Sequence, residues 1–233
     1  LMCIRDRTGL RDEVGDLTEE TSNIRYFAGD LREKLTLANL LSATLDAFDQ
    51  VNILVNAARQ VTTTAPLDPD DESMSVMLAQ NLLSSLKLSQ LVARRMIKQG
   101  KDSEKSCIGA IVNLSSIAAQ RTQAELMAFS VSCAAMDQMT RSLAVSLAPE
   151  RVRVNAVAFG SVMSASLKGH LKQHPDQREA ILAATPQGRI AGPTEVAEAV
   201  QFLVSDSSAF VTGEILTVDG GRSLIDAVST SLH

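Results

Sequence analysis

Three sets of side chains in this sequence could do chemistry. Ser115 and Ser116 end an apolar run, but a serine hydroxyl needs an adjacent base before it can transfer protons usefully. His170 and His174 share one face if "GHLKQH" is helical, which makes them either a candidate base or a solvated surface pair. Cys133 is either a candidate nucleophile or a small buried residue that packs between helices, and no neighbour in sequence would lower its pKa.

A helical stretch at 127–144, "MAFSVSCAAMDQMTRSLA", carries two further residues of interest. Phe129 and Cys133 are four positions apart, so they share one helix face, one turn from each other. Phenylalanine has no exchangeable proton, and a thiol is ordinarily neutral and a weak hydrogen-bonding group. The residue types on this face therefore predict packing, and they exclude a strong acid or base.

Apolar runs and helical periods alternate along the chain. The expected strands are "NIRYFAG" (23–29), "VNILVN" (51–56), "GAIVNLS" (109–115), "RVRVNAVAF" (151–159) and "EILTVDG" (214–220). The expected helices span about 33–48, 72–99, 126–148 and 194–204. Strands rich in Val and Ile with long helical crossovers predict an α/β fold with a parallel sheet covered by helices on both faces.

Parallel sheets of this kind bind ligands beyond the carboxyl ends of their strands. The loops after Gly29, Asn56, Ser115 and Phe159 are therefore the candidate site. A late segment, 169–193, is polar and interrupted by Gly and Pro. Such an insertion is either a substrate lid or a plain surface excursion.

Composition excludes several classes of function. The formal net charge of −5 and the scattered basic residues argue against a nucleic-acid-binding surface. Three cysteines without paired or metal-ligand spacing indicate neither a disulfide framework nor a zinc site. No apolar run reaches the ~18–20 residues that span a membrane, and charge at residues 1–20 argues against a secretory signal. We therefore expect a cytoplasmic protein with no membrane partner.

Five motifs in order resemble the short-chain dehydrogenase/reductase family, and the resemblance runs from about residue 8 to 223. They are "ILVNAAR" (53–59), "AQNLLSSLKLSQ" (79–90), "GAIVNLSSIAA" (109–119), "RVRVNAVAFGSVMS" (151–164) and the stretch 193–221, which is the most specific. The resemblance implies a doubly wound, Rossmann-like parallel sheet in a single domain. It also implies hydride transfer between NAD or NADP and a carbonyl or alcohol of a small-molecule substrate.

The resemblance assigns roles to individual positions. In the catalytic centre, Ser116 takes the place of the Ser that polarises the substrate oxygen, and Asn81 that of the Asn that holds a relay water. Phe129 stands at the Tyr and Cys133 at the Lys of the Tyr-x-x-x-Lys motif. Cofactor contacts are implied for Asp30, Asn56, Ala57, Ala58, Gly160, Val162 and Ser164. Asp30 is alternatively an ordinary polar residue at a strand end.

The departures from the family's motifs remove the groups that the family uses for proton transfer and cofactor binding. Losing a general acid–base typically costs roughly 10² to 10⁴ in rate, and Cys133 cannot supply the positive charge that a Lys provides. Ala57 replaces a second Asn, Arg59 replaces a Gly beside the cofactor, and Phe159 replaces a Pro. Arg59 could alternatively contact a phosphate. We therefore expect an inactive family member, with a non-catalytic structural or partner subunit as the alternative.

The family's first strand–helix–strand unit, with its Gly-rich phosphate turn, has no counterpart in this sequence. Residues 1–7 contain "MCIRDR", which resembles a translated sequencing adapter, so we expect 1–7 to be non-native and 8–233 to form a Rossmann-like domain that is incomplete at its N-terminus. Binding of NAD or NADP is accordingly in question. Helices 72–99 and 126–148 resemble the family's dimer helices, which predicts a homodimer or homotetramer.

Overall fold

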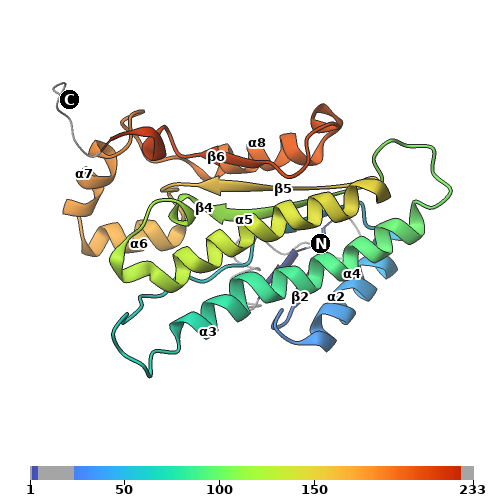
Figure 1. The fold of residues 1–233 in the computed structure, drawn as a ribbon, viewed down its shortest axis with the longest axis horizontal. Helices are drawn as coiled ribbons and strands as arrows, with labels where there is room; N and C mark the ends of the chain where they lie inside the picture. Colours follow the sequence, from blue (N-terminus) through green and yellow to red (C-terminus); the bar gives the residue numbers. More distant parts are fainter. Residues whose placement is uncertain (1, 5–23, 227–233) are drawn as a thin grey trace.

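The computed structural model describes residues 2–4 and 24–226, and its central element is a four-stranded parallel sheet of order β3-β4-β5-β6. Its strands are β3 (Ile53–Asn56), β4 (Gly109–Ser116), β5 (Val152–Phe159) and β6 (Ile215–Val218). The eight residues of β5 are all buried, as expected for a strand covered on both faces. The predicted α/β fold with a doubly wound parallel sheet is confirmed (Figure 1).

Helices cover the two faces of the sheet. One face carries α4 (Ser84–Gln99) and α5 (Met127–Leu147), which lie side by side in Figure 1, and the other carries α8 (Pro193–Val204). Helix α8 begins with Pro193, whose fixed φ suits the first helical position, and Glu195 reaches back to the Gly192 N–H at 2.6 Å. The predicted helices thus form where their periodicity placed them.

A second, two-stranded sheet lies apart from the first. It pairs β1 (Met2–Ile4) with β2 (Tyr26–Ala28) in parallel, and α2 (Lys34–Phe48) follows. The described part of the chain has no pairing between β2 and β3. That 1–7 are non-native and that the domain from residue 8 lacks the family's first strand–helix–strand unit both stay predictions, and residues 1 and 5–23 lie outside the described residues.

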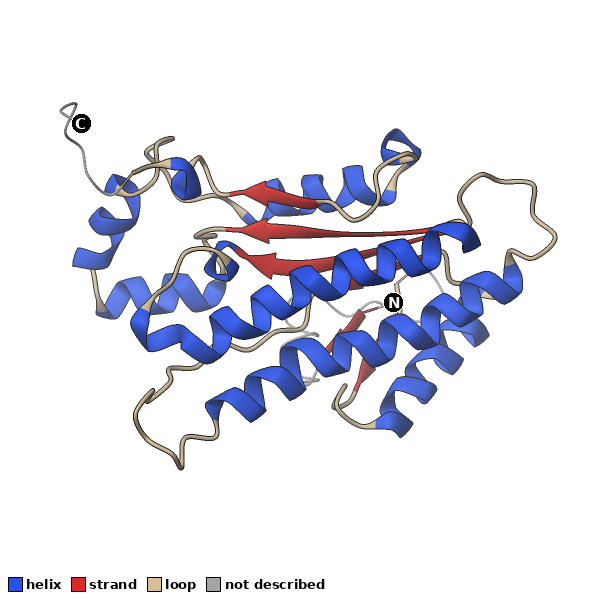
Figure 2. Cartoon of the chain, viewed as in Figure 1, coloured by secondary structure: helices blue, strands red, loops and turns tan. Residues whose placement is uncertain are grey.

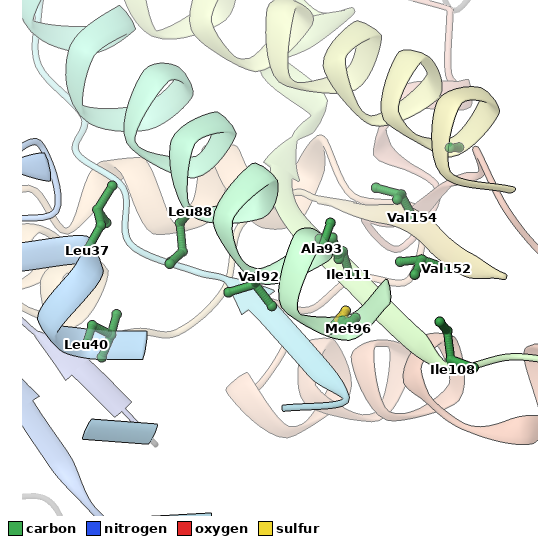
Figure 3. Close-up of a cluster of buried hydrophobic side chains, with 11 residues drawn as sticks. Leu37, Leu40, Leu88, Val92, Ala93, Met96, Ile108, Ile111, Val152 and Val154 are labelled. Atoms are coloured by element: carbon green, nitrogen blue, oxygen red, sulfur yellow. The ribbon is translucent and has the colours of Figure 1, made fainter. Parts of the chain in front are cut away.

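Alternation along the strands separates two hydrophobic clusters. Ile111 and Val154 point toward α4 and α5, and Figure 3 shows them packed with Met96 of α4. Their neighbours Val112 and Val157 point the other way, against α8. Leu37 and Leu40 of α2 join the α4 cluster (Figure 3), so apolar packing through α2 ties the two-stranded sheet to the main one.

The expected helix 72–99 has an irregular centre. Helix α3 (Ser73–Met77) passes into a π-helical turn, η1 (Leu78–Leu83), before α4 begins. The segment 169–193, expected to be either a lid or a surface excursion, contributes the end of α6 (Ala165–Gln173) and all of α7 (Asp176–Ala183). Figure 2 shows both helices at the end of the molecule toward which the arrowheads of β4, β5 and β6 point. The carboxyl ends of the strands and α6–α7 therefore share one end of the fold.

Candidate functional site

Ser116, the expected substrate-polarising residue, lies where β4 ends. Its Oγ accepts the Ala118 N–H at 3.2 Å and donates to the Phe159 carbonyl at 3.4 Å. The hydroxyl thus caps the short 3₁₀ turn that follows β4 and bridges to β5. Both of these contacts are with the backbone, so the side chain is held in place by local structure.

Phe129 and Cys133 lie on the face of α5 that packs against the sheet, and they are 5% and 6% exposed. Burial raises the pKa of the Cys133 thiol to about 11; nearby Arg59 opposes this rise and Asp137 adds to it. A thiol with this pKa is neutral at physiological pH and a poor nucleophile. The structure therefore supports the packing interpretation of Cys133.

Asn81 sits in the π-helical turn and joins this centre. Its Nδ2 donates to the Gln60 carbonyl at 2.9 Å and to Ser132 Oγ at 3.2 Å, and its Oδ1 accepts the Gln60 N–H at 2.8 Å. Ser132 in turn donates to the Phe129 carbonyl at 2.8 Å. Single π turns recur at functional sites. Here the turn directs Asn81 toward Ser132 of α5.

Arg59 is the unexpected member of the site. Its guanidinium carbon lies 4.1 Å from the ring centroid of Phe159 and 5.7 Å from that of Phe129, and Nη1 donates to the Ser115 carbonyl at 3.4 Å. Three positions that depart from the family, 59, 129 and 159, therefore lie close together around one guanidinium. Arg59 is an exposed residue by surface area, but the walls of the cleft partly desolvate its guanidinium and lower its pKa.

Asp137, which our sequence reasoning did not select, is buried one turn beyond Cys133. It is 4% exposed, and its Oδ1 has no hydrogen-bond partner among the described residues. Burial raises the pKa of this carboxyl, while the Ser115 hydroxyl and Arg141 oppose the rise. An acidic residue four positions after Cys133, on the apolar face of the helix, is the sequence signal that would have identified it.

The cofactor contacts expected at the end of β3 are divided between interior and surface. Asn56 is buried and points inward, with Nδ2 donating to Asn113 Oδ1 at 2.8 Å and to Ser89 Oγ at 2.9 Å. Ala57 and Ala58 are exposed and line a groove of about 550 Å³ between α2 and α4. Asn56 thus acts as a structural residue, and its two neighbours remain accessible.

The residues expected to contact nicotinamide line a different hollow. Gly160, Val162 and Ser164 lie along a cleft of about 1470 Å³ that also holds Arg59. A Cβ at Gly160 would approach Asp219 Cβ to 3.1 Å, so a side chain there would require the neighbouring residue to shift by a few tenths of an ångström. Ser164 caps α6 by accepting the Leu167 N–H at 3.2 Å.

Asp30, the expected adenine contact, follows β2 and forms an ion pair with Arg32. It lines neither the Ala57 groove nor the Arg59 cleft. The alternative, a polar residue at a strand end, describes this position equally well. Its role in binding stays a prediction.

The two histidines are on α6 and at its end. Their ring centroids are 4.7 Å apart, and His170 Nε2 lies 2.7 Å from Gln177 Oε1 of α7. His170 lines the Arg59 cleft, whereas His174 does not. This placement fits a lid segment, but it does not put an imidazole in hydrogen-bond contact with Ser115 or Ser116.

Within residues 24–226, every helix is too short or too polar to cross a bilayer. The cytoplasmic location stays a prediction from composition.

Known proteins resemble this chain over most of its length. The family model described as Enoyl-(Acyl carrier protein) reductase matches residues 1–223. A 3-oxoacyl-[acyl-carrier-protein] reductase of Vibrio cholerae is 34% identical over 80% of this chain and 72% of its own length. Galactitol 2-dehydrogenase of Cereibacter sphaeroides is 36% identical over 78% of this chain and 70% of its own, and L-xylulose reductase of Mus musculus is 31% identical over 91% and 82%.

Solved structures agree on the fold. The crystal structure of gox2181 superposes with a TM-score of 0.85 at 28% identity, covering 96% of this chain and 85% of that one. ElxO with NADP bound superposes with a TM-score of 0.81 at 23% identity, covering 94% and 86%, which is a likeness of fold. The matched motifs, the parallel sheet and these relatives together place the chain in the short-chain dehydrogenase/reductase family, a family of NAD(P)-dependent oxidoreductases.

Proposed function

We propose that this chain is a non-catalytic member of its family, which keeps the fold and no longer reduces carbonyls by the family's proton-transfer route. One observation carries the proposal: Phe129 and Cys133 are both buried where a proton donor and its cationic partner would stand. Phe129 has no exchangeable proton, and Cys133, with its pKa raised to about 11, is a neutral thiol at pH 7 that supplies no positive charge. Ser116 alone lacks a base.

The residues present do not fit a nicotinamide cofactor held in the family's manner. Cys133 cannot clamp ribose hydroxyls as a lysine ammonium would. Arg59 places a cation over Phe159, on the turn that resembles the nicotinamide cover, and a cation there disfavours an oxidised, positively charged nicotinamide. These residues therefore do not support hydride transfer from NADH or NADPH in this chain.

An enzyme assay tests this proposal. Purified protein is mixed with NADH or NADPH and with an acetoacetyl thioester or L-xylulose, which are compounds of the kinds that the relatives' names indicate. We expect no nucleotide oxidation above the buffer rate. Turnover that disappears in Ser116→Ala would contradict the proposal and restore the oxidoreductase interpretation.

A thermal melt separates loss of chemistry from loss of cofactor binding. A nucleotide that binds only the folded chain at ~100 times its Kd should add about 2.7 kcal/mol to the unfolding free energy. We expect neither NADH nor NADPH to raise the melting temperature. A higher melting temperature with one nucleotide, in a chain that shows no turnover, would show that the chain binds the cofactor without catalysing the reaction.

The alternative, a structural or partner subunit, is favoured by apolar side chains on the outer faces of two helices. Leu83, Val131 and Val145 are 43%, 41% and 77% exposed. We propose that helices 72–99 and 126–148 pair across a homodimer or homotetramer. Sedimentation equilibrium measures the mass, and a monomer at micromolar concentration would rule this out.

A further inference from the structure

The cleft that holds Arg59 combines a cation with apolar walls. Its lining includes Leu114, Phe159, Val162 and Val196, which come from β4, β5, the following turn and α8. A volume of about 1470 Å³ exceeds the roughly 300–1,000 Å³ typical of small-molecule pockets, so a ligand of considerable size would fit. Polar side chains such as Glu125, Ser164 and His170 also line the cleft, and mostly apolar walls with a few polar groups are the usual composition of a ligand site.

Arg59 lacks a carboxylate partner within residues 24–226. The ion pairs there join Arg32 to Asp30 and Arg189 to Glu195. Glu125 also lines the cleft, but it is not within ion-pair distance of Arg59. The guanidinium donates one long hydrogen bond to the Ser115 carbonyl, which leaves most of its five N–H groups for other acceptors.

The two aromatic rings fix the direction of the guanidinium. The guanidinium carbon lies 4.1 Å from the Phe159 ring centroid, a cation–π contact, and Nη1 donates a long hydrogen bond to the Ser115 carbonyl, so two contacts restrict where the group can point. A planar, pre-oriented guanidinium pairs with carboxylate or phosphate oxygens through two parallel hydrogen bonds. Little side-chain entropy is then lost when an anion binds.

We propose that this cleft binds an anionic ligand, whose carboxylate or phosphate oxygens pair with the Arg59 guanidinium and whose apolar body lies along the walls. The site requires neither hydride transfer nor a bound dinucleotide, so it stands independently of the non-catalytic function proposed above. The anionic head is specified by Arg59, and the apolar body by residues such as Leu114 and Val196.

Calorimetric titration with three probes tests the proposal on the wild-type chain first. Hexanoate carries both features, 1-hexanol carries the apolar body alone, and inorganic phosphate carries the charge alone. We expect hexanoate to bind at least about tenfold more tightly than hexanol, and added salt to weaken only the anions. Equal affinity for hexanoate and hexanol, or no binding of either anion, would overturn the proposal.

Variants then locate the binding. Arg59→Gln should bring hexanoate to within about twofold of hexanol, and Arg59→Lys should give an intermediate affinity because it keeps the charge and loses the fork. Arg121→Gln, an exposed arginine outside the cleft, is the matched control and should bind hexanoate as the wild type does. Circular dichroism melts check the folding of each variant.

Phosphate distinguishes the two sources of anionic oxygen. Phosphate that competes with hexanoate and requires Arg59 supports the site and indicates a phosphate-bearing ligand; hexanoate binding without phosphate binding supports the site and indicates an organic acid. Binding of either anion that survives Arg59→Gln overturns the assignment to this cleft.

Discussion

Two buried polar clusters, each with residues of α5, differ in how completely their hydrogen bonds are satisfied. In the first, Asn56 donates to Asn113, Asn113 donates to Thr140 Oγ1 at 2.8 Å, and Thr140 donates to the Met136 carbonyl at 2.9 Å. In the second, Cys133 is an unionised thiol and Asp137 keeps an oxygen with no partner among the described residues.

The contrast separates polar residues that stabilise the fold from polar residues whose hydrogen bonds are incomplete. Fully partnered buried networks stabilise one arrangement of the core, whereas each unpartnered group costs free energy. The satisfied cluster joins β3, β4 and α5, and it sits below the site. The unsatisfied cluster sits at the candidate site, where Cys133 stands at the position that the family resemblance assigns to a lysine.

The largest effect is expected from breaking the satisfied cluster. Asn113→Ala removes two buried hydrogen bonds and leaves a cavity, so we expect the unfolding free energy to fall by roughly 2–4 kcal/mol. Urea denaturation measures this change. Thr140→Val is the partner for a double-mutant cycle, and the two losses should be less than additive because they share one bond. Full additivity would show that the cluster is not coupled.

The second prediction concerns the reactivity of Cys133. Its pKa, raised to about 11 from an ordinary 9.0, lowers the thiolate fraction at pH 8 about 100-fold, and burial slows access further. Iodoacetamide should therefore label Cys133 at least about 100-fold more slowly in the folded chain than in urea. Peptide mass spectrometry reads each site separately. Rapid labelling of folded Cys133 would refute the description of an inert thiol.

The third prediction is that replacing Asp137 in the second cluster stabilises the folded chain. Asp137→Asn removes a buried, incompletely partnered carboxyl, and we expect it to raise the unfolding free energy at pH 7 by roughly 1–2 kcal/mol. A carboxyl whose pKa is raised on folding makes the folded state less stable as pH rises from its unfolded pKa to its folded pKa. The gain should therefore be largest at neutral pH and vanish below the unfolded value of 3.8.

Urea titrations of wild type and Asp137→Asn at several pH values between 3 and 7 measure this gain. Ser115→Ala is a suitable companion, because it removes the hydroxyl that opposes the rise in the pKa of Asp137. A constant difference between wild type and Asp137→Asn across the pH range would show that the carboxyl does not titrate as described.

Much of this fold was predictable from sequence, because strand and helix periodicities are local. The apolar runs at 109–115 and 151–159 correspond to β4 and β5; β4 is one residue longer than expected and β5 one residue shorter. The clustering of Arg59 with Phe129 and Phe159 was not predictable, since these residues are 70 and 100 positions from Arg59 and no local pattern links them. The family motifs predicted most of the positions in the candidate site. The direction of the Asn56 side chain, which points inward to Asn113, was seen only in the structure.

The smallest effect is expected at an exposed polar cluster, where water competes for every bond. Glu195 accepts from Arg189 and from the Gly192 N–H, and these contacts lower its pKa to about 2. Glu195→Gln should destabilise the chain slightly at neutral pH. Because the pKa is lower in the folded state, the loss should shrink as pH falls from 4.5 toward 2. Glu198→Gln, an exposed residue on the same helix, is the control, and an equal effect at both positions would mean that only net charge matters.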